Sequence, residues 1–239
     1  MLCVGRTLPT SPSKEVEVVA TEPQVDKQTA LTHKPWRTIG QKVVAVLRCL
    51  LEPRILLLLC LFLNNGYAQL VVSSQVTRQV QNVKMVGLAM AVFAVVEVIT
   101  TLVLGALSDR LGSRVMLLIA VLVELGGAAG TLYMNVHQGG WVFLPTSLFA
   151  VMDTIYQTEC MSVVGKYFRD ELEEASATYR LVQGLGSSVS SFVTPLFVTA
   201  GASASTQEQL TLEMAIAGGF GVLSYILFLI FMKIYGKKD

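Results

Sequence analysis

The feature that most constrains this chain is the recurrence of long, mainly apolar runs of about 20 residues. A helix rises about 1.5 Å per residue, so about 20 residues are needed to cross the roughly 30 Å hydrocarbon core of a bilayer. The links between the runs are mostly too short to hold a folded soluble domain. We therefore predict an all-α membrane protein with six spans, near residues 55–76, 85–107, 115–136, 141–164, 181–200 and 214–235.

Composition excludes several other classes of protein. Charged residues make up 15% of the chain, where a soluble domain carries about 25%. A net charge of +1 gives no basic footprint for nucleic acid. The four cysteines are scattered and there are two histidines, so we expect neither a metal site nor a disulfide framework. We find no catalytic motif, and we expect no enzyme activity and no cofactor.

The N-terminal part differs in character from the rest. Residues 1–34 are polar and lack apolar periodicity, which predicts a disordered cytosolic tail or a linker. In residues 35–54, apolar side chains such as Trp36, Ile39 and Val43 recur at helical spacing. This pattern predicts either an amphipathic helix on the inner leaflet or an extension of the first span on its cytosolic side. Residues 55–239 then form the transmembrane part.

The distribution of Lys and Arg predicts the orientation. Cytosolic loops of membrane proteins carry an excess of these residues. With the N-terminus inside, the outer loops hold only Arg78 and Lys84, whereas the inner segments hold the others. We therefore expect an integral membrane protein with both termini in the cytosol.

Acidic side chains within the predicted spans need a physical reason, because each costs about 2.5–3.5 kcal/mol at the centre of a span. They could line a polar path for ions or protons, or they could hydrogen-bond between helices and fix the packing. Helical spacing places Asp153 on the face of Gln157, and Arg180 on the face of Gln183. The candidate intramembrane polar residues are Glu97, Glu124, Asp153, Gln157, Glu159, Arg180 and Gln183.

Two further interpretations concern how the spans meet. Glu159 and Arg180 both fall near the cytosolic boundary of consecutive spans, so we expect them to form an ion pair. Small residues at a spacing of four mark close helix contacts in membranes. We expect such contacts in three spans, at Gly126 and Gly130, at Gly184, Gly186, Ser188 and Ser190, and at Gly218, Gly219 and Gly221.

The link after the second span carries a recognisable motif, Gly105-Ala-Leu-Ser-Asp109-Arg110-Leu-Gly112-Ser-Arg114. It resembles the signature loop of the major facilitator superfamily. In that superfamily the loop bridges two helices and latches one conformation of an alternating-access cycle. The resemblance implies the same role for Gly105, Asp109, Arg110, Gly112 and Arg114.

A second set of runs resembles the C-terminal half of the Unc-ninety-three-like family, which is named for a potassium-channel regulator. The runs are Asp153-Thr-Ile-Tyr-Gln157-Thr-Glu159, Val164-Gly-Lys-Tyr-Phe168, Glu173-Glu-Ala175 and Tyr179-Arg-Leu-Val-Gln183-Gly-Leu-Gly186. The resemblance covers roughly residues 55–235. The chain departs from the family where Gln157 replaces an Asn, Glu159 a Gln and Val182 a Trp.

This resemblance implies one six-helix half of a twelve-span bundle. The implied partners are the lipid bilayer, a second six-helix half from a missing N-terminal part or another chain, and a membrane protein that the bundle serves. The implied function is to regulate or escort a membrane partner such as an ion channel or receptor. The alternative is a secondary transporter of a small solute or ion, with proton coupling one option.

Overall fold

The computed structural model describes residues 35–71, 80, 83–133, 139–199 and 206–236, which are helical apart from short turns. The chain has two compact units, Met1–Gly40 and Gln41–Asp239. The predicted tail, residues 1–34, and the predicted span ends at 72–76, 134–136 and 200 lie outside the described residues. The helices are α1 (Pro35–Leu50), α2 (Pro53–Val71), α4 (Val83–Tyr133), α5 (Phe143–Tyr167), α6 (Leu172–Thr199) and α7 (Thr206–Tyr235). Two short 3-10 turns, η4 (Gly139–Val142) and η5 (Arg169–Glu171), precede α5 and α6.

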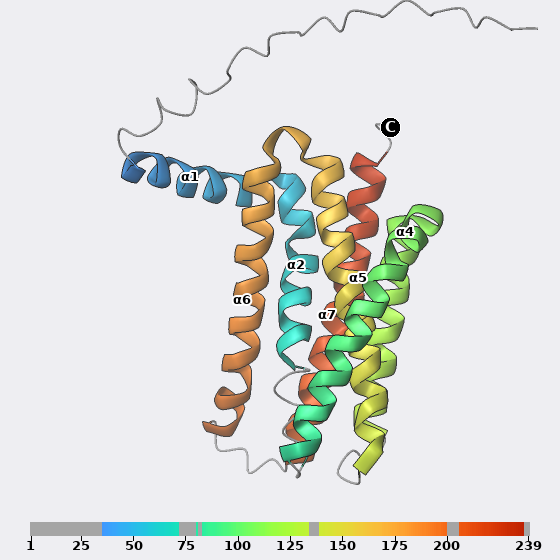
Figure 1. The fold of residues 1–239 in the computed structure, drawn as a ribbon. Coiled ribbons are helices and arrows are strands. Elements are labelled where there is room, and N and C mark those ends of the chain that lie inside the picture. The colour runs from blue at the N-terminus through green and yellow to red at the C-terminus, as the bar shows by residue number, and fades with distance from the viewer. Residues whose placement is uncertain (1–34, 72–79, 81–82, 134–138, 200–205, 237–239) are drawn as a thin grey trace, which may run out of the picture. The chain divides into compact units, whose positions relative to one another are not determined.

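One helix contains two of the predicted spans. α4 has 51 residues, about 76 Å at 1.5 Å per residue, but it breaks at Gly112. Gly112 has φ 75° and ψ 156°, a conformation that is essentially confined to glycine. Figure 1 shows the two arms of α4 folding back along each other from this point, at the same end of the bundle as the turn between α5 and α6.

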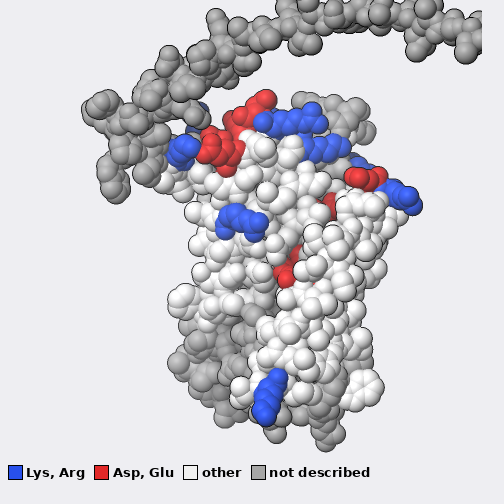
Figure 2. All heavy atoms as spheres, in the orientation of Figure 1, with Lys and Arg blue, Asp and Glu red and all other residues white. Residues whose placement is uncertain are grey.

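The helices pack side by side, and within the described residues three of them are long and apolar enough to cross a membrane by length and composition. These three are Pro53–Val71, Val83–Tyr133 and Glu208–Tyr235. α4 packs chiefly on α5, and α2 packs on both α6 and α7. Figure 2 shows the charged side chains gathered mainly at the end of the bundle that holds the α4 break, with few on the helix faces. The fold is therefore an all-helical bundle with an apolar surface and a charged end.

α1 and α2 are separate helices. Leu51 and Glu52 form a turn between them, and Pro53 starts α2 at the position where proline fits a helix best. The helix of this stretch thus ends at Leu50 and is not continuous with α2. On the second half of α1, Lys42 pairs with Glu173 of α6, and the hydrogen bond to that carboxylate raises the pKa of Lys42. Whether α1 lies in the membrane interface stays a prediction.

α2 and α6 are in backbone contact at two glycines. A Cβ added at Gly66 would lie 1.9 Å from the carbonyl oxygen of Gln183, and one at Gly186 would lie 2.2 Å from that of Leu63. Ser187 Oγ also donates a hydrogen bond of 2.9 Å to the carbonyl oxygen of Gly66. Only glycine permits this approach, because the facing backbone occupies the space that a side chain at either position would need.

The predicted small-residue contacts are confirmed at some positions and wrong at others. Gly221 touches the Glu124 side chain and Gly218 touches Leu125, whereas Gly184 and Gly219 face open space. Gly126 and Gly130 make ordinary contacts with α5. Spacing alone could not separate Gly186 from Gly184, because the distinction depends on which way α6 is turned toward α2.

We predict that Gly186→Ala destabilises the bundle by about 1–3 kcal/mol, because the new methyl group must push apart two backbones. Gly184→Ala on the same helix is the matched control, and its stability should stay within about 1 kcal/mol of the starting protein. Thermal unfolding of the purified chain in detergent measures both variants. Equal midpoints for the two variants would contradict the contact between α2 and α6.

Candidate functional site

A cavity of about 710 Å³, lined by both polar and apolar side chains, opens on the face formed by α2, the first arm of α4, α5 and α6. Apolar side chains such as Val98 and Leu102 form part of its wall. Its polar lining residues come from four helices, and they are Gln69, Glu97, Thr101, Thr154, Gln157, Thr158 and Arg180. The cavity thus brings together three of the predicted polar residues, Glu97, Gln157 and Arg180. It also includes Gln69 of α2, which the sequence analysis did not select.

Asp153 lies directly behind this wall and is fully buried. Its Oδ2 accepts hydrogen bonds from Gln157 Nε2 at 2.9 Å and from Gln69 Nε2 at 3.3 Å. The shared face of Asp153 and Gln157 is therefore confirmed. The carboxyl of Glu97 lies close enough to the Asp153 carboxyl to interact with it, and Asp153 Oδ1 has no donor among the described residues. Two acids and two amides thus meet at one point of the cavity wall.

Arg180 of α6 also lines the cavity. Its Nη1 donates a 2.9 Å hydrogen bond to Gln183 Oε1, so the predicted face of Arg180 and Gln183 is confirmed. The guanidinium also lies over the ring of Tyr179, with 5.1 Å between Cζ and the ring centroid. Tyr179 is buried, and its hydroxyl accepts a 2.7 Å hydrogen bond from Asn65 Nδ2.

The predicted ion pair between Glu159 and Arg180 is wrong. Glu159 is fully buried, and its Oε1 accepts a 2.5 Å hydrogen bond from Ser108 Oγ of α4. Arg180 is exposed, and it contacts Gln183 and Tyr179 instead. The reason is geometric: α5 packs far more on α4 than on α6, and Glu159 lies on the side of α5 that faces α4.

Glu124 is also buried away from the cavity. Its Oε2 accepts hydrogen bonds from Tyr156 Oη at 2.8 Å and from Asn64 Nδ2 at 3.4 Å. The four acids selected from the sequence therefore divide into two groups. Glu97 and Asp153 meet at the cavity, whereas Glu124 and Glu159 are hydrogen-bonded inside the protein.

Several polar residues of these sites were missed by the sequence analysis. Asn64, Asn65 and Gln69 are amides within an otherwise apolar run, which was the signal that could have identified them. Tyr156 and Tyr179 have their hydroxyls in hydrogen bonds at depth. A fourth buried acid among the described residues, Glu213 of α7, lies near the Tyr67 hydroxyl and was outside the predicted span by one residue.

The signature-loop residues lie around the break in α4. Gly105 is helical and meets open space, while Asp109, Arg110 and Arg114 are exposed. Asp109, Gly112 and Arg114 line a second cavity, of about 420 Å³, together with residues of α5 and with Met232 of α7. The motif therefore sits where the two arms of α4 meet the end of α5, but the latch that the resemblance implies stays a prediction.

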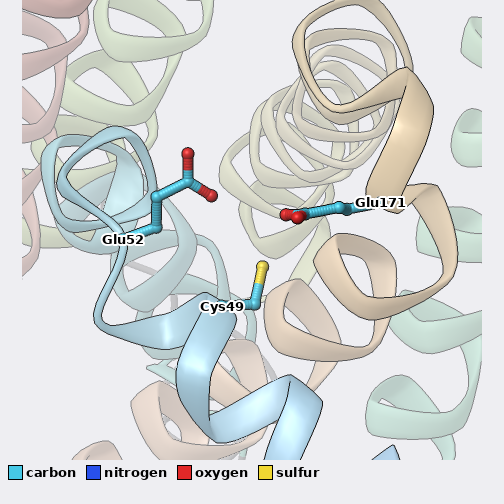
Figure 3. A group of neighbouring side chains, drawn as sticks. All are labelled: Cys49, Glu52 and Glu171. Atoms are coloured by element: carbon cyan, nitrogen blue, oxygen red, sulfur yellow. The ribbon is translucent and has the colours of Figure 1, made fainter.

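A third group lies where α1 meets α2 and η5, with Cys49, Glu52 and Glu171 within 4.8 Å of one another. Figure 3 shows the Cys49 sulfur pointing between the two carboxylates. Burial, aided by Glu171 and Glu52, raises the pKa of Cys49, so the thiolate that a metal would bind is disfavoured. Arg54 also pairs with Glu52, at 3.2 Å. We therefore do not assign a metal to this group.

Comparison with known proteins gives the class to which the chain belongs. Residues 54–238, and residues 2–191 in an overlapping alignment, match the Major Facilitator Superfamily. The chain belongs to this superfamily of membrane proteins.

Curated relatives narrow the assignment. The chain is 28% identical over 149 residues to Protein unc-93 homolog A of Danio rerio, which covers 60% of this chain and 32% of the relative. It is 26% identical over 157 residues to the Bos taurus protein of that name, which covers 63% of this chain and 34% of the relative. Within the superfamily the chain is thus similar to proteins of the Unc-ninety-three-like branch, and it spans about a third of the length of these relatives. No solved structure matches it.

We predict that Gln157→Leu destabilises the protein by about 1–3 kcal/mol, because Asp153 loses the nearer of its two amide donors. Thr158→Val is the control on the same helix, and it should change stability by no more than about 0.5 kcal/mol. Glu97→Gln should leave stability unchanged or raised, since it removes one of two facing acids. Thermal unfolding midpoints in detergent test all three. A larger loss in Thr158→Val than in Gln157→Leu would contradict this account of the cavity wall.

Proposed function

We propose that the chain forms one six-helix half of a major-facilitator bundle, with the two arms of α4 as separate spans and both termini in the cytosol. Each arm is longer than the roughly 20 residues that a span requires. The gathering of charges at the end with the α4 break supports that end as the cytosolic one (Figure 2). We keep the interpretation that the chain is not an enzyme.

We further propose that this half lines a path for a proton or small cation. The observation that carries the proposal is the meeting of Glu97 and Asp153 at the wall of the 710 Å³ cavity. Two neighbouring carboxyls that repel each other cannot both be ionised at low cost, so the pair holds one proton or one cation between them. The amides of Gln69 and Gln157 stabilise the remaining negative charge. Uptake and release of one positive charge is what such a group does chemically.

A second six-helix half would complete the path. The first arm of α4 exposes apolar side chains beside the acids, with Leu102 79% exposed and Val98 62% exposed. Both residues also line the cavity, so a partner on this face would close it from the open side. The missing half of a longer chain and a separate chain both fit this role.

The second candidate function is regulation or escort of a membrane partner such as an ion channel or receptor. The observation that favours it is that Glu124 and Glu159 are hydrogen-bonded inside the bundle, away from the cavity. Acids used in this way fix helix packing and need no transported ion.

Cysteine accessibility distinguishes the two candidates. In a background with the native cysteines replaced by serine, we predict that Thr101→Cys and Thr158→Cys react with an impermeant, water-soluble thiol reagent in cell membranes, because both line the cavity. Leu122→Cys is the control, since Leu122 is 58% exposed on the second arm of α4 and does not line the cavity. Labelling of the two cavity positions but not of Leu122→Cys supports the path. Absence of labelling at both cavity positions would favour the regulator.

The same reagent tests the topology. A cysteine at Gly139 should be labelled from outside intact cells, and one at Gly236 only after permeabilisation, because the basic residues lie on the Gly236 side. A cysteine at Gly139 that is labelled only after permeabilisation, like one at Gly236, would rule out the six-span arrangement.

A further inference from the structure

Glu124 is a titratable group that the proposed path does not use. It lies on the second arm of α4 with none of its surface exposed. An ionised carboxylate in such a place needs a cation or several hydrogen-bond donors to offset the lost hydration. Its surroundings therefore indicate which form it takes.

Three helices face the Glu124 carboxyl. α2 contributes Asn64, α5 contributes Tyr156, and α7 contributes the backbone of Gly221 with Ser224 nearby. The carboxyl is buried, and Tyr156 and Asn64 donate hydrogen bonds to it. Among the described residues, no Lys, Arg or second acid acts on it. Tyr156 is the titratable neighbour, and it acts as a hydrogen-bond donor. The site thus supplies dipoles and no positive charge.

The two carboxyl oxygens of Glu124 differ in their partners. Oε2 accepts both hydrogen bonds, from Tyr156 Oη at 2.8 Å and from Asn64 Nδ2 at 3.4 Å. Oε1 has no donor among the described residues, and neither has Asn64 Oδ1. This is the pattern of a carboxylic acid, in which one oxygen is a carbonyl acceptor and the other carries the hydrogen. The neighbouring Asn64 Oδ1 is then an oxygen that is free to accept a hydrogen bond from the protonated carboxyl oxygen.

We propose that Glu124 is a proton-binding site, occupied by a proton in the folded bundle and separate from the Glu97 and Asp153 pair. A proton fits where a larger ion does not, because α7 lies directly against the group. A Cβ at Gly221 would lie 2.4 Å from Glu124 Oε2. A calcium ion would require six to eight oxygen ligands, and the side chains that hydrogen-bond here supply fewer.

The position gives the proton a consequence for the fold. Glu124 lies where α2, α4, α5 and α7 meet, and the neutral acid lets α7 pack against it without water. Loss of the proton would leave an unpaired charge that requires water or a donor, so it would force α7 or α2 to move away. The site couples one protonation event to the packing of four helices, whatever solute the bundle serves.

Infrared spectroscopy of the purified full chain in lipid vesicles at pH 7 tests the proposal, since a protonated carboxyl has a carbonyl stretch that a carboxylate lacks. We expect a carbonyl component in the starting protein that is lost in Glu124→Gln. It should persist in the control Asp109→Asn, whose acid is exposed. A carbonyl region unchanged by Glu124→Gln would overturn the proposal.

Tyr156→Phe provides a second measurement should Glu124→Gln fail to fold. It removes the 2.8 Å donor to the carbonyl oxygen, so the carbonyl component should shift in frequency without disappearing. An unshifted component would overturn the proposal. Replacing potassium by sodium in the buffer should also leave the component unchanged, and its loss in sodium would identify a cation site instead. None of these measurements needs transport, so they are independent of the proposed path.

Discussion

The backbone contact between α2 and α6 is the constraint on which the polar sites depend. Gly66 and Gly186 let the two helices approach until carbonyl oxygens of one touch the Cα region of the other. Apolar side chains gain little by leaving lipid, so helices in a membrane associate through such close packing and through hydrogen bonds between helices. This approach holds α2 at the middle of the bundle. From there, Asn64 reaches Glu124, Asn65 reaches Tyr179 and Gln69 reaches Asp153.

The four acids are accommodated in two different ways, and the difference is one of surroundings rather than of residue type. Glu124 and Glu159 each have a hydroxyl donor within 2.8 Å and lie inside the protein. Asp153 has amide donors instead, and a second acid, Glu97, faces it from a half-buried position on the cavity wall. Hydroxyl and amide dipoles stabilise a single carboxyl well, but they do not remove the repulsion between two charged ones. This repulsion sets the pair at the cavity apart from the two acids inside the protein.

Much of the fold could be predicted from the sequence, because length and hydropathy are the properties that a bilayer selects. The helices and the acids within them follow from that pattern, and so do the pairs one turn apart, Asp153 with Gln157 and Arg180 with Gln183. What the pattern lacks is the rotation of each helix toward its neighbours. The wrong pairing of Glu159 with Arg180 came from assuming that consecutive helices are the closest ones, whereas α5 packs mainly on α4.

The same limit explains the missed amides of α2. Asn64 and Gln69 interrupt an apolar run, but an amide costs less to bury than a charge, so the sequence marks an amide less strongly than an acid. The amides decide the chemistry nonetheless, since a buried carboxyl without a cation depends on the donors that surround it. Asn64 donates to a lone acid, and Gln69 donates to one of two facing acids. Residues five positions apart on one central helix thus serve two acids of different character, which is why α2 connects the packed interior of the bundle to its cavity.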